Sequence, residues 1–368
     1  MGNPLFACLV PILDTVWDTM IDPYLTPIKV LMIGSSCRKM RQIVTGCKAP
    51  HVGLRVCVSS FATVFAITNS AWRTRIHTLK CYDFGGLLLE WIWKQMPALQ
   101  SLYLVFCTNV RIGKAKFPPH LYICNSTFAD TNWDIYSLSN CKHLIIRGSM
   151  AKFINNMLFG DFILHPIGIE SIVLINSKIS QTRLQLNPAF SSIQSLTLQN
   201  STTNATSVTL LPNVKNLEIT MWNTSSDVLF VDAQHLRSLR LCAIMTNVAL
   251  KINDLSNIER LKLDLCDGLR HIPPTPNATH IAISNCYHLV SSLATCSISF
   301  QAHKCHNLQL THCFHKSNNE KQTCSISNIK SLDWRAFSNT NNAQITIHAI
   351  GSFVCEDALK EMFVQVIE

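Results

Sequence analysis

The chain has 368 residues, of which 48% are hydrophobic and only 14% are charged, and it carries 16 Cys and a formal net charge of +9. It is too apolar for a disordered tail and too long for a disulfide-stapled miniprotein, whereas its length allows one large domain or two. The longest apolar stretch near the start, 5–13, is much shorter than the roughly 20 residues that span a bilayer as a helix, so we expect no membrane segment.

Residues 1–48 are expected to form a short helical segment. Asp14 is a suitable N-cap, and Pro23 and Pro27 would end helices. Lys39 and Arg41 lie near the expected end of the last helix, where cations interact favourably with the helix dipole. The next residues, 49–75, show no copy of the repeat that follows them, and we expect a cap or linker there.

Part of the helical segment resembles the second half of an F-box. It reads Leu25-Thr-Pro-Ile-Lys-Val-Leu-Met-Ile-Gly-Ser-Ser-Cys37-Arg-Lys-Met-Arg41, in which Leu, Thr and Pro precede an apolar helix that ends in Cys and basic residues. The resemblance implies that the segment binds a Skp1-like adaptor of a cullin ubiquitin ligase. The residues at family positions, and so implied to bind the adaptor, are Leu13, Ile21, Leu25, Pro27, Val30, Leu31, Cys37 and Arg41. The alternative is a plain helical cap, which every solenoid needs.

From residue 76 onward the pattern apolar-x-x-apolar-x-apolar recurs along the chain, for example as Leu99-Gln-Ser-Leu102-Tyr-Leu104. Its middle apolar residues are Leu79, Leu102, Leu121, Leu144, Ile172, Leu196, Leu217, Leu239, Leu261, Ile281, Leu308 and Leu332, with a further weak copy at Ile345. Most steps are about 19 to 24 residues, which is the period of leucine-rich repeats. Between 121 and 172 the copies are irregular and their register stays open.

This period predicts an α/β fold, a curved leucine-rich-repeat solenoid of about 12 repeats over residues 76–350. Each repeat would supply one strand whose alternate side chains point inward, and a return segment. Stacked repeats would share one core. Residues 351–368 carry apolar residues at helical spacing and are expected to form a helix that caps the last repeat.

Four repeats have a Cys three residues after the last apolar position of the strand, at Cys107, Cys266, Cys286 and Cys313. These repeats resemble the cysteine-containing repeats of F-box proteins and of plant-type immune receptors. We interpret the Cys as buried, reduced thiols with a structural role, and we expect a cytoplasmic or nuclear protein.

The sequence lacks the Gly-rich phosphate loop, the G-x-S-x-G elbow and the H-E-x-x-H helix, so we expect no enzyme, no catalytic residue and no cofactor. His and Cys crowd into residues 303–315, but their spacing does not match the usual zinc ligand pairs, and we expect no metal. The basic residues are spread along the chain without a run, which argues against a nucleic-acid partner.

The residues between the inward-pointing apolar positions should face the concave surface of the solenoid. Among them, Arg240, Arg260 and Lys262 would be neighbours on two adjacent strands. We expect this patch to bind an acidic or phosphorylated segment of a protein partner, and the alternative is ordinary solvated surface.

The combined pattern resembles that of F-box proteins with leucine-rich repeats. The resemblance implies a substrate-recognition subunit of an SCF-type ubiquitin ligase, with a Skp1-like adaptor, a cullin and a protein substrate as partners. The alternative is a leucine-rich-repeat scaffold, or an immune-type sensor fragment, without a ubiquitin-ligase connection.

Overall fold

The structure is a computed structural model, and it forms two compact units, residues 1–150 and residues 151–368. Among the described residues, helix is scarce and none is long and apolar enough to cross a membrane. The described residues are 54–58, 64–65, 67, 69, 73–74, 76–112, 116–129, 138–148, 158, 167–176, 178–179, 183–200, 202–203, 206–224, 228–244, 249–292, 294–310, 313–314, 322–332, 343–348 and 364–367.

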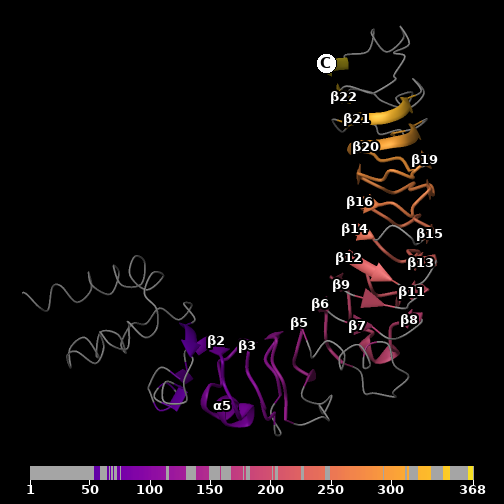
Figure 1. Cartoon of the computed structure of the whole chain (residues 1–368). Coiled ribbons are helices and arrows are strands. Elements are labelled where there is room, and N and C mark those ends of the chain that lie inside the picture. The colour runs from indigo at the N-terminus through magenta and orange to yellow at the C-terminus, as the bar shows by residue number, and fades with distance from the viewer. Residues whose placement is uncertain are drawn as a thin grey trace, which may run out of the picture. The chain divides into compact units, whose positions relative to one another are not determined.

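Unit 1 (residues 1–150) contains a parallel sheet whose strands pair in chain order. Its strands are β1 (Leu54–Val58), β2 (Ile76–Tyr82), β3 (Ser101–Val105), β4 (His120–Cys124) and β5 (His143–Arg147). The segment between β2 and β3 contains helix α5 (Leu89–Gln95), which buries Leu89 and Ile92 (Figure 1).

Strand β1 corrects the expectation of a mere cap or linker at residues 49–75, because Val56 pairs in parallel with Leu79 of β2. The sequence pattern missed this strand because Gly53 stands where the repeat has its leading apolar residue.

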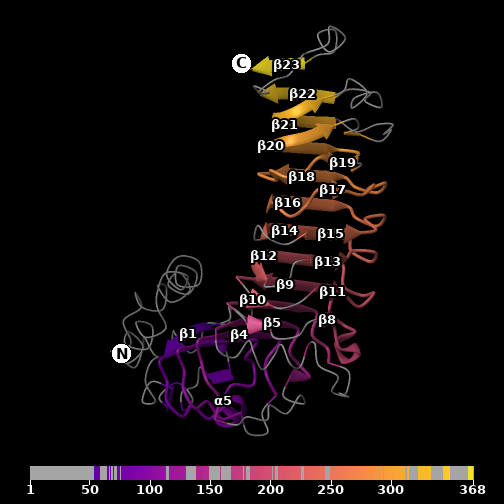
Figure 2. The same ribbon diagram turned by 45° about the vertical axis from the view of Figure 1, so that its right-hand side comes forward.

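Unit 2 (residues 151–368) is a parallel β-solenoid, in which the chain alternates between a main sheet and a second sheet (Figure 2). The main sheet contains β6 (Ser171–Ile175), β9 (Ser195–Gln199), β12 (Asn216–Thr224), β14 (Ser238–Ile244), β16 (Arg260–Cys266), β18 (His280–Ser284), β20 (Ser299–Leu310), β21 (Gln322–Leu332), β22 (Ala343–His348) and β23 (Val364–Ile367). The second sheet contains β8 (Arg183–Gln185), β11 (Ser207–Thr209), β13 (Val228–Asp232) and β15 (Ala249–Asn253). Shorter pieces are β7 (Lys178–Ile179), β10 (Thr202–Thr203), β17 (His271–Ile272), β19 (Ser291–Ser292) and the 3-10 helix η4 (Pro188–Phe190).

The repeat solenoid is therefore confirmed, but the helical character expected of an α/β fold is scarce. In unit 2 several return segments are strands because they are rich in β-branched and aromatic residues, as in the Val-Leu-Phe-Val run of β13. The expected C-terminal helix also needs correction, since Val364–Ile367 form β23 and pair in parallel with β22. Residues 351–363 of that expected helix lie outside the described residues.

The register follows the predicted middle apolar residues over most of the chain. In unit 1, Leu79, Leu102, Leu121 and Leu144 are partners in successive strands. In unit 2 the corresponding row, by which we mean the register partners of the middle apolar residue in successive strands, runs through Ile172, Leu196, Leu217, Leu239, Leu261 and Ile281. All of these residues are buried. Parallel pairing in this register stacks the apolar side chains of consecutive turns into one core.

The register predicted for the next two turns is wrong. The partner of Ile281 is Phe300, and the row continues through Cys324 to Ile345, as predicted for Ile345 alone. Leu308 is buried in the later part of β20, beyond the row, and Leu332 pairs with Leu310 rather than with the row. The strand of Phe300 has the small Ala302 as its last apolar residue, so its repeat pattern is weak in the sequence. The Leu308-Gln-Leu310 segment fits the pattern better, and the sequence therefore predicts the repeat there.

Each turn bends at the same corner, four residues after the row residue. The corner residue has a positive φ in twelve turns, at Asp83, Phe106, Asn125, Gly148, Asn176, Asn200, Met221, Ala243, Leu265, Asn285, Lys304 and Asn328. In many turns the following residue is a small buried one, such as Cys107, Ser126, Cys266 or Cys286. In the turn of Phe300 that position belongs to Cys305, and this corrects the prediction of Cys313.

Candidate functional site

The outward side chains of the main sheet of unit 2 form a charged row. Glu218 of β12, Arg240 of β14 and Lys262 of β16 are direct register partners on three adjacent strands. Arg260 precedes Lys262 by two residues on the same face of β16, and it pairs with His280 of β18. The structure therefore brings together the three residues that the sequence singled out, because the alternation of strand side chains places them on one face.

The charges of this row are only partly balanced. Arg240 Nη1 lies 3.0 Å from Glu218 Oε1, and both side chains are partly exposed, so this ion pair contributes little to stability. Arg260 and Lys262 are exposed and make no ion pair in the described part of the chain. The row can therefore offer two unpaired cations to an anionic group.

Asp264 lies at the end of the row and is held by hydrogen bonds from two neighbouring strands. Its Oδ1 accepts from Ser284 Oγ at 2.7 Å and from Asn285 Nδ2 at 2.8 Å, and its Oδ2 accepts from Cys242 Sγ at 3.6 Å. Burial tends to raise the pKa of Asp264, but these three donors and the charge of Lys262 outweigh it and leave the pKa below its usual value. The carboxylate of Asp264 therefore stays ionised, and the cationic surface ends at this negative charge.

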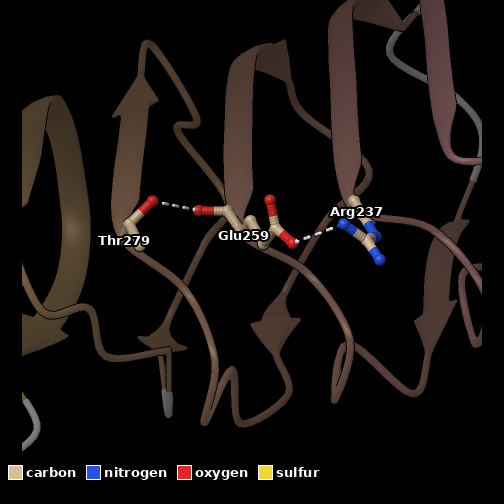
Figure 3. A network of polar contacts seen from close by, with 3 residues as sticks. All are labelled: Arg237, Glu259 and Thr279. Atoms are coloured by element: carbon tan, nitrogen blue, oxygen red, sulfur yellow. Dashed lines mark hydrogen bonds and ion pairs between the residues drawn. The ribbon is translucent and has the colours of Figure 1, made fainter.

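A second network joins the starts of three strands (Figure 3). Arg237 Nη1 lies 3.4 Å from Glu259 Oε1, and Thr279 Oγ1 donates to the carbonyl oxygen of Glu259 at 2.9 Å. These residues immediately precede β14, β16 and β18. Because Arg237 and Glu259 are largely exposed, the network mainly orients side chains beside the charged row.

Unit 1 carries an aromatic group on the corresponding face of its sheet, which the sequence reasoning missed. Lys80 Nζ lies 4.9 Å from the centre of the Tyr103 ring, and the ring centres of Tyr103 and Tyr122 are 5.5 Å apart. The rings of His120 and His143 stack with centres 4.7 Å apart and planes 7° apart. These pairs are register partners, so the alternation that marked Arg240 and Lys262 could also have marked them. Tyr is enriched in protein interfaces.

Two groups of this aromatic face have shifted pKa values. Burial lowers the pKa of His120, and His143 lowers it further because two stacked imidazolium charges would repel each other. Burial also raises the pKa of Tyr122, with a further increase from Cys124 and an opposing effect of Arg147. At neutral pH His120 and Tyr122 are therefore neutral, and their rings lie on the same face as the cation of Lys80.

Where the structure describes their side chains, from Cys81 to Cys324, the Cys residues are free thiols, and all of these except Cys242 are buried. Burial raises the pKa of Cys141 to about 12, and it also raises the pKa values of Cys107 and Cys313. The thiolate, which is the reactive form, is therefore rare at these positions. At the corners the thiols donate to the carbonyl oxygen two residues earlier, for example from Cys305 to His303 at 3.3 Å. The arrangement supports a structural role.

The His and Cys residues between 303 and 315 engage other partners where the structure describes them. His303 Nδ1 lies 2.9 Å from Ser327 Oγ, Cys305 Sγ donates to the carbonyl of His303, and the ring of His306 stacks on Tyr287. In the described part of the chain, no group of three or more His, Cys, Asp or Glu side chains is placed to hold a metal ion.

The residues implied to bind an adaptor, which lie between Leu13 and Arg41, are outside the described residues, and so is the rest of the segment 1–48. Comparisons of the chain with protein-family models, with curated proteins and with solved structures find no match.

Proposed function

We propose that this chain is a non-catalytic receptor that binds a protein partner through the outward face of the main sheet of unit 2. The observation that carries the proposal is the in-register row Glu218–Arg240–Lys262, with the unpaired cation of Arg260 beside it. A parallel sheet holds the backbone positions of these residues at fixed spacings, so binding would lose little backbone conformational entropy of the receptor. Arg offers a planar pair of donors to a carboxylate or phosphate, and Lys adds a point charge.

We further propose that the receptor is the substrate-recognition subunit of an SCF-type ubiquitin ligase. The support is the resemblance of residues 25–41 to an F-box, followed by a repeat solenoid that offers a recognition surface. In this role the chain contributes proximity, because it would hold a substrate near enzymes on other chains. The partners are then a Skp1-like adaptor, a cullin and a protein substrate, in the cytoplasm or nucleus, without nucleic acid, membrane or cofactor. The alternative role is a scaffold without a ligase connection.

The recognition surface is tested by reversing its charge. We expect Arg240→Glu with Lys262→Glu to weaken binding of phosphorylated or Glu-rich peptides about tenfold or more, measured by fluorescence polarisation. Lys330→Glu, an exposed charge change in β21, is the matched control and should leave binding unchanged. Thermal melting followed by circular dichroism checks that the double variant is folded. Equal affinity of the folded double variant and the wild-type chain would remove the proposal.

A further inference from the structure

The second sheet of unit 2 ends abruptly at β15. On one side β15 pairs with β13 over its whole length. On the other side, among the described residues, its backbone pairing with the next turn is confined to one bridge between Leu250 and Leu269, where the N–H of Leu250 donates to the carbonyl of Gly268 at 3.0 Å. The strand in the return segment of the next turn, β17, pairs with β19 instead.

The described pairing of this turn with β15 ends at the bridge to Leu250. Pro273 and Pro274 directly follow β17 and have no backbone N–H, so they cannot continue that strand as a ladder. An exposed strand edge of this kind is a template for pairing with another chain.

A hollow of about 620 Å³ lies at this edge. Its volume is within the range of natural ligand sites. Its floor includes the buried side chains of Leu250, Ile252 and Ile272, and Phe230 of β13 extends it with a side chain that is 43% exposed. The hollow is lined by Phe230, Ala249, Leu250, Lys251, Ile252, Gly268, Arg270, His271, Ile272, Pro273, Pro274 and Ser291.

The ionisable residues that line the hollow are all basic. They are Lys251, Arg270 and His271, and no Asp or Glu is among the lining residues. Lys251, Arg270 and His271 are exposed, and His271 Nδ1 is held 2.7 Å from Ser291 Oγ. Asp267 lies next to Gly268 in sequence but does not line the hollow. An apolar floor with cations at its rim is complementary to an amphipathic anion.

We propose that the hollow beside β15 binds an extended acidic peptide segment of a partner protein, which adds to the edge of β15 as a further strand. Backbone groups of the segment would pair with the open edge, alternate apolar side chains would enter the hollow, and its carboxylates would meet Lys251 and Arg270. The open edge favours a peptide over a fatty-acid-like molecule, which has no backbone to pair. This site belongs to the second sheet and is independent of the function proposed for the main sheet.

The test uses the full-length chain and a short fluorescein-labelled peptide of alternating Glu and Val, with binding measured by fluorescence polarisation. We expect saturable binding that weakens about tenfold or more in the Lys251→Glu, Arg270→Glu double variant. The Lys330→Glu variant should bind as the wild-type chain does. Both variants change exposed side chains, and circular dichroism melting verifies their folding.

Three comparisons decide the outcome. The same peptide with alternate backbone amides methylated should fail to bind, because methylation removes the donors needed for strand addition. Equal binding of the methylated peptide would overturn the proposal. Binding of dodecanoate without binding of the peptide would overturn the proposal in favour of a small amphiphilic ligand. If neither probe binds, the proposal is also overturned, and the hollow binds neither class of ligand.

Discussion

At the scale of single residues, the corner of each turn has the strictest requirement. A positive φ is easily adopted by Gly and is tolerated by Asn and Asp, and these three residue types together occupy seven of the twelve corners. Other L-residues lose roughly 1–2 kcal/mol there. Gly148 is further restricted, because a Cβ atom at that position would collide with the side chain of Asn125. Several corners are nonetheless occupied by unfavourable residues, namely Phe106, Met221, Ala243, Leu265 and Lys304. These positions store backbone strain.

Replacing Leu265 by Asn should therefore raise the free energy of unfolding by about 1 kcal/mol. The φ of Leu265 is 51°, and its side chain is already 41% exposed, so little buried area is lost. Urea unfolding measures the gain. The matched control is Val290→Asn, which alters a similarly exposed apolar residue whose φ is not positive. A Leu265→Asn variant no more stable than the Val290→Asn variant would show that the corner carries no strain.

The stacked imidazoles of unit 1 should make stability depend on pH. The pKa of His120 is lowered from its ordinary 6.5 in the folded chain, so the unfolded chain binds more protons once the pH falls through about 6.5. Stability is thus fully present above that pH and declines below it. We expect the drop in melting temperature between about pH 7.5 and about pH 5.5 to be smaller in His120→Gln than in the wild-type chain. An unchanged drop would remove His120 as its source.

At the scale of elements, each turn is bonded to the next by side chains as well as by the sheets. Thr275, which is fully buried, donates from Oγ1 to the carbonyl of Thr295 at 2.7 Å and accepts from the N–H of Thr295 at 3.0 Å. These two hydrogen bonds join the turn of Thr275 to the turn of Thr295. The exposed side of the same turns has a weaker link, from Thr279 to the carbonyl of Glu259.

Thr275→Val should lower the free energy of unfolding by about 1–3 kcal/mol, because it removes the two hydrogen bonds that the buried hydroxyl of Thr275 makes with the backbone of Thr295. Thr279→Val should cost about 0.5 kcal/mol or less, since water can replace its exposed hydrogen bond. Chemical unfolding of the two variants gives the comparison. Equal losses in both would mean that the buried pair does not join the turns.

How far the sequence predicts these elements depends on how regular each repeat is. The rows through Leu102 and Leu239 were predictable because three apolar residues at fixed spacing mark each strand. The signal failed where the strand of Phe300 contains the small Ala302, and at β1, where Gly53 interrupts the pattern.

Candidate sites were predictable only in part. Alternation along the strands identified Arg240 and Lys262 as neighbours, and the same rule applied to unit 1 would have found Tyr103 and Tyr122. The hollow beside β15 could not be found this way, because it arises from a pairing that is absent between two turns. Pro273 and Pro274 line it, but a proline pair alone does not predict such a hollow.

At the scale of the whole chain, the composition now has a physical explanation. The described apolar and Cys residues largely line the interior of the turns, so a low charged fraction is compatible with a folded chain that has no membrane-spanning helix in its described part. The net charge of +9 includes two local groups of cations in unit 2, at Arg260 and Lys262 of the main sheet and at Lys251 and Arg270 near the second sheet. Each group of cations is proposed to bind a separate anionic segment of a partner.

The proposed role as the receptor subunit of a ubiquitin ligase is tested most directly by adaptor binding. The purified chain should co-elute with a purified Skp1-like adaptor in size-exclusion chromatography. The Pro27→Ala, Leu31→Ala double variant should lose this complex, because both residues occupy F-box positions that are implied to contact the adaptor. Met32→Ala, a neighbouring change at a position outside that set, should retain it. A wild-type chain that elutes apart from the adaptor, or a folded double variant that still binds it, would contradict the claim and favour a scaffold.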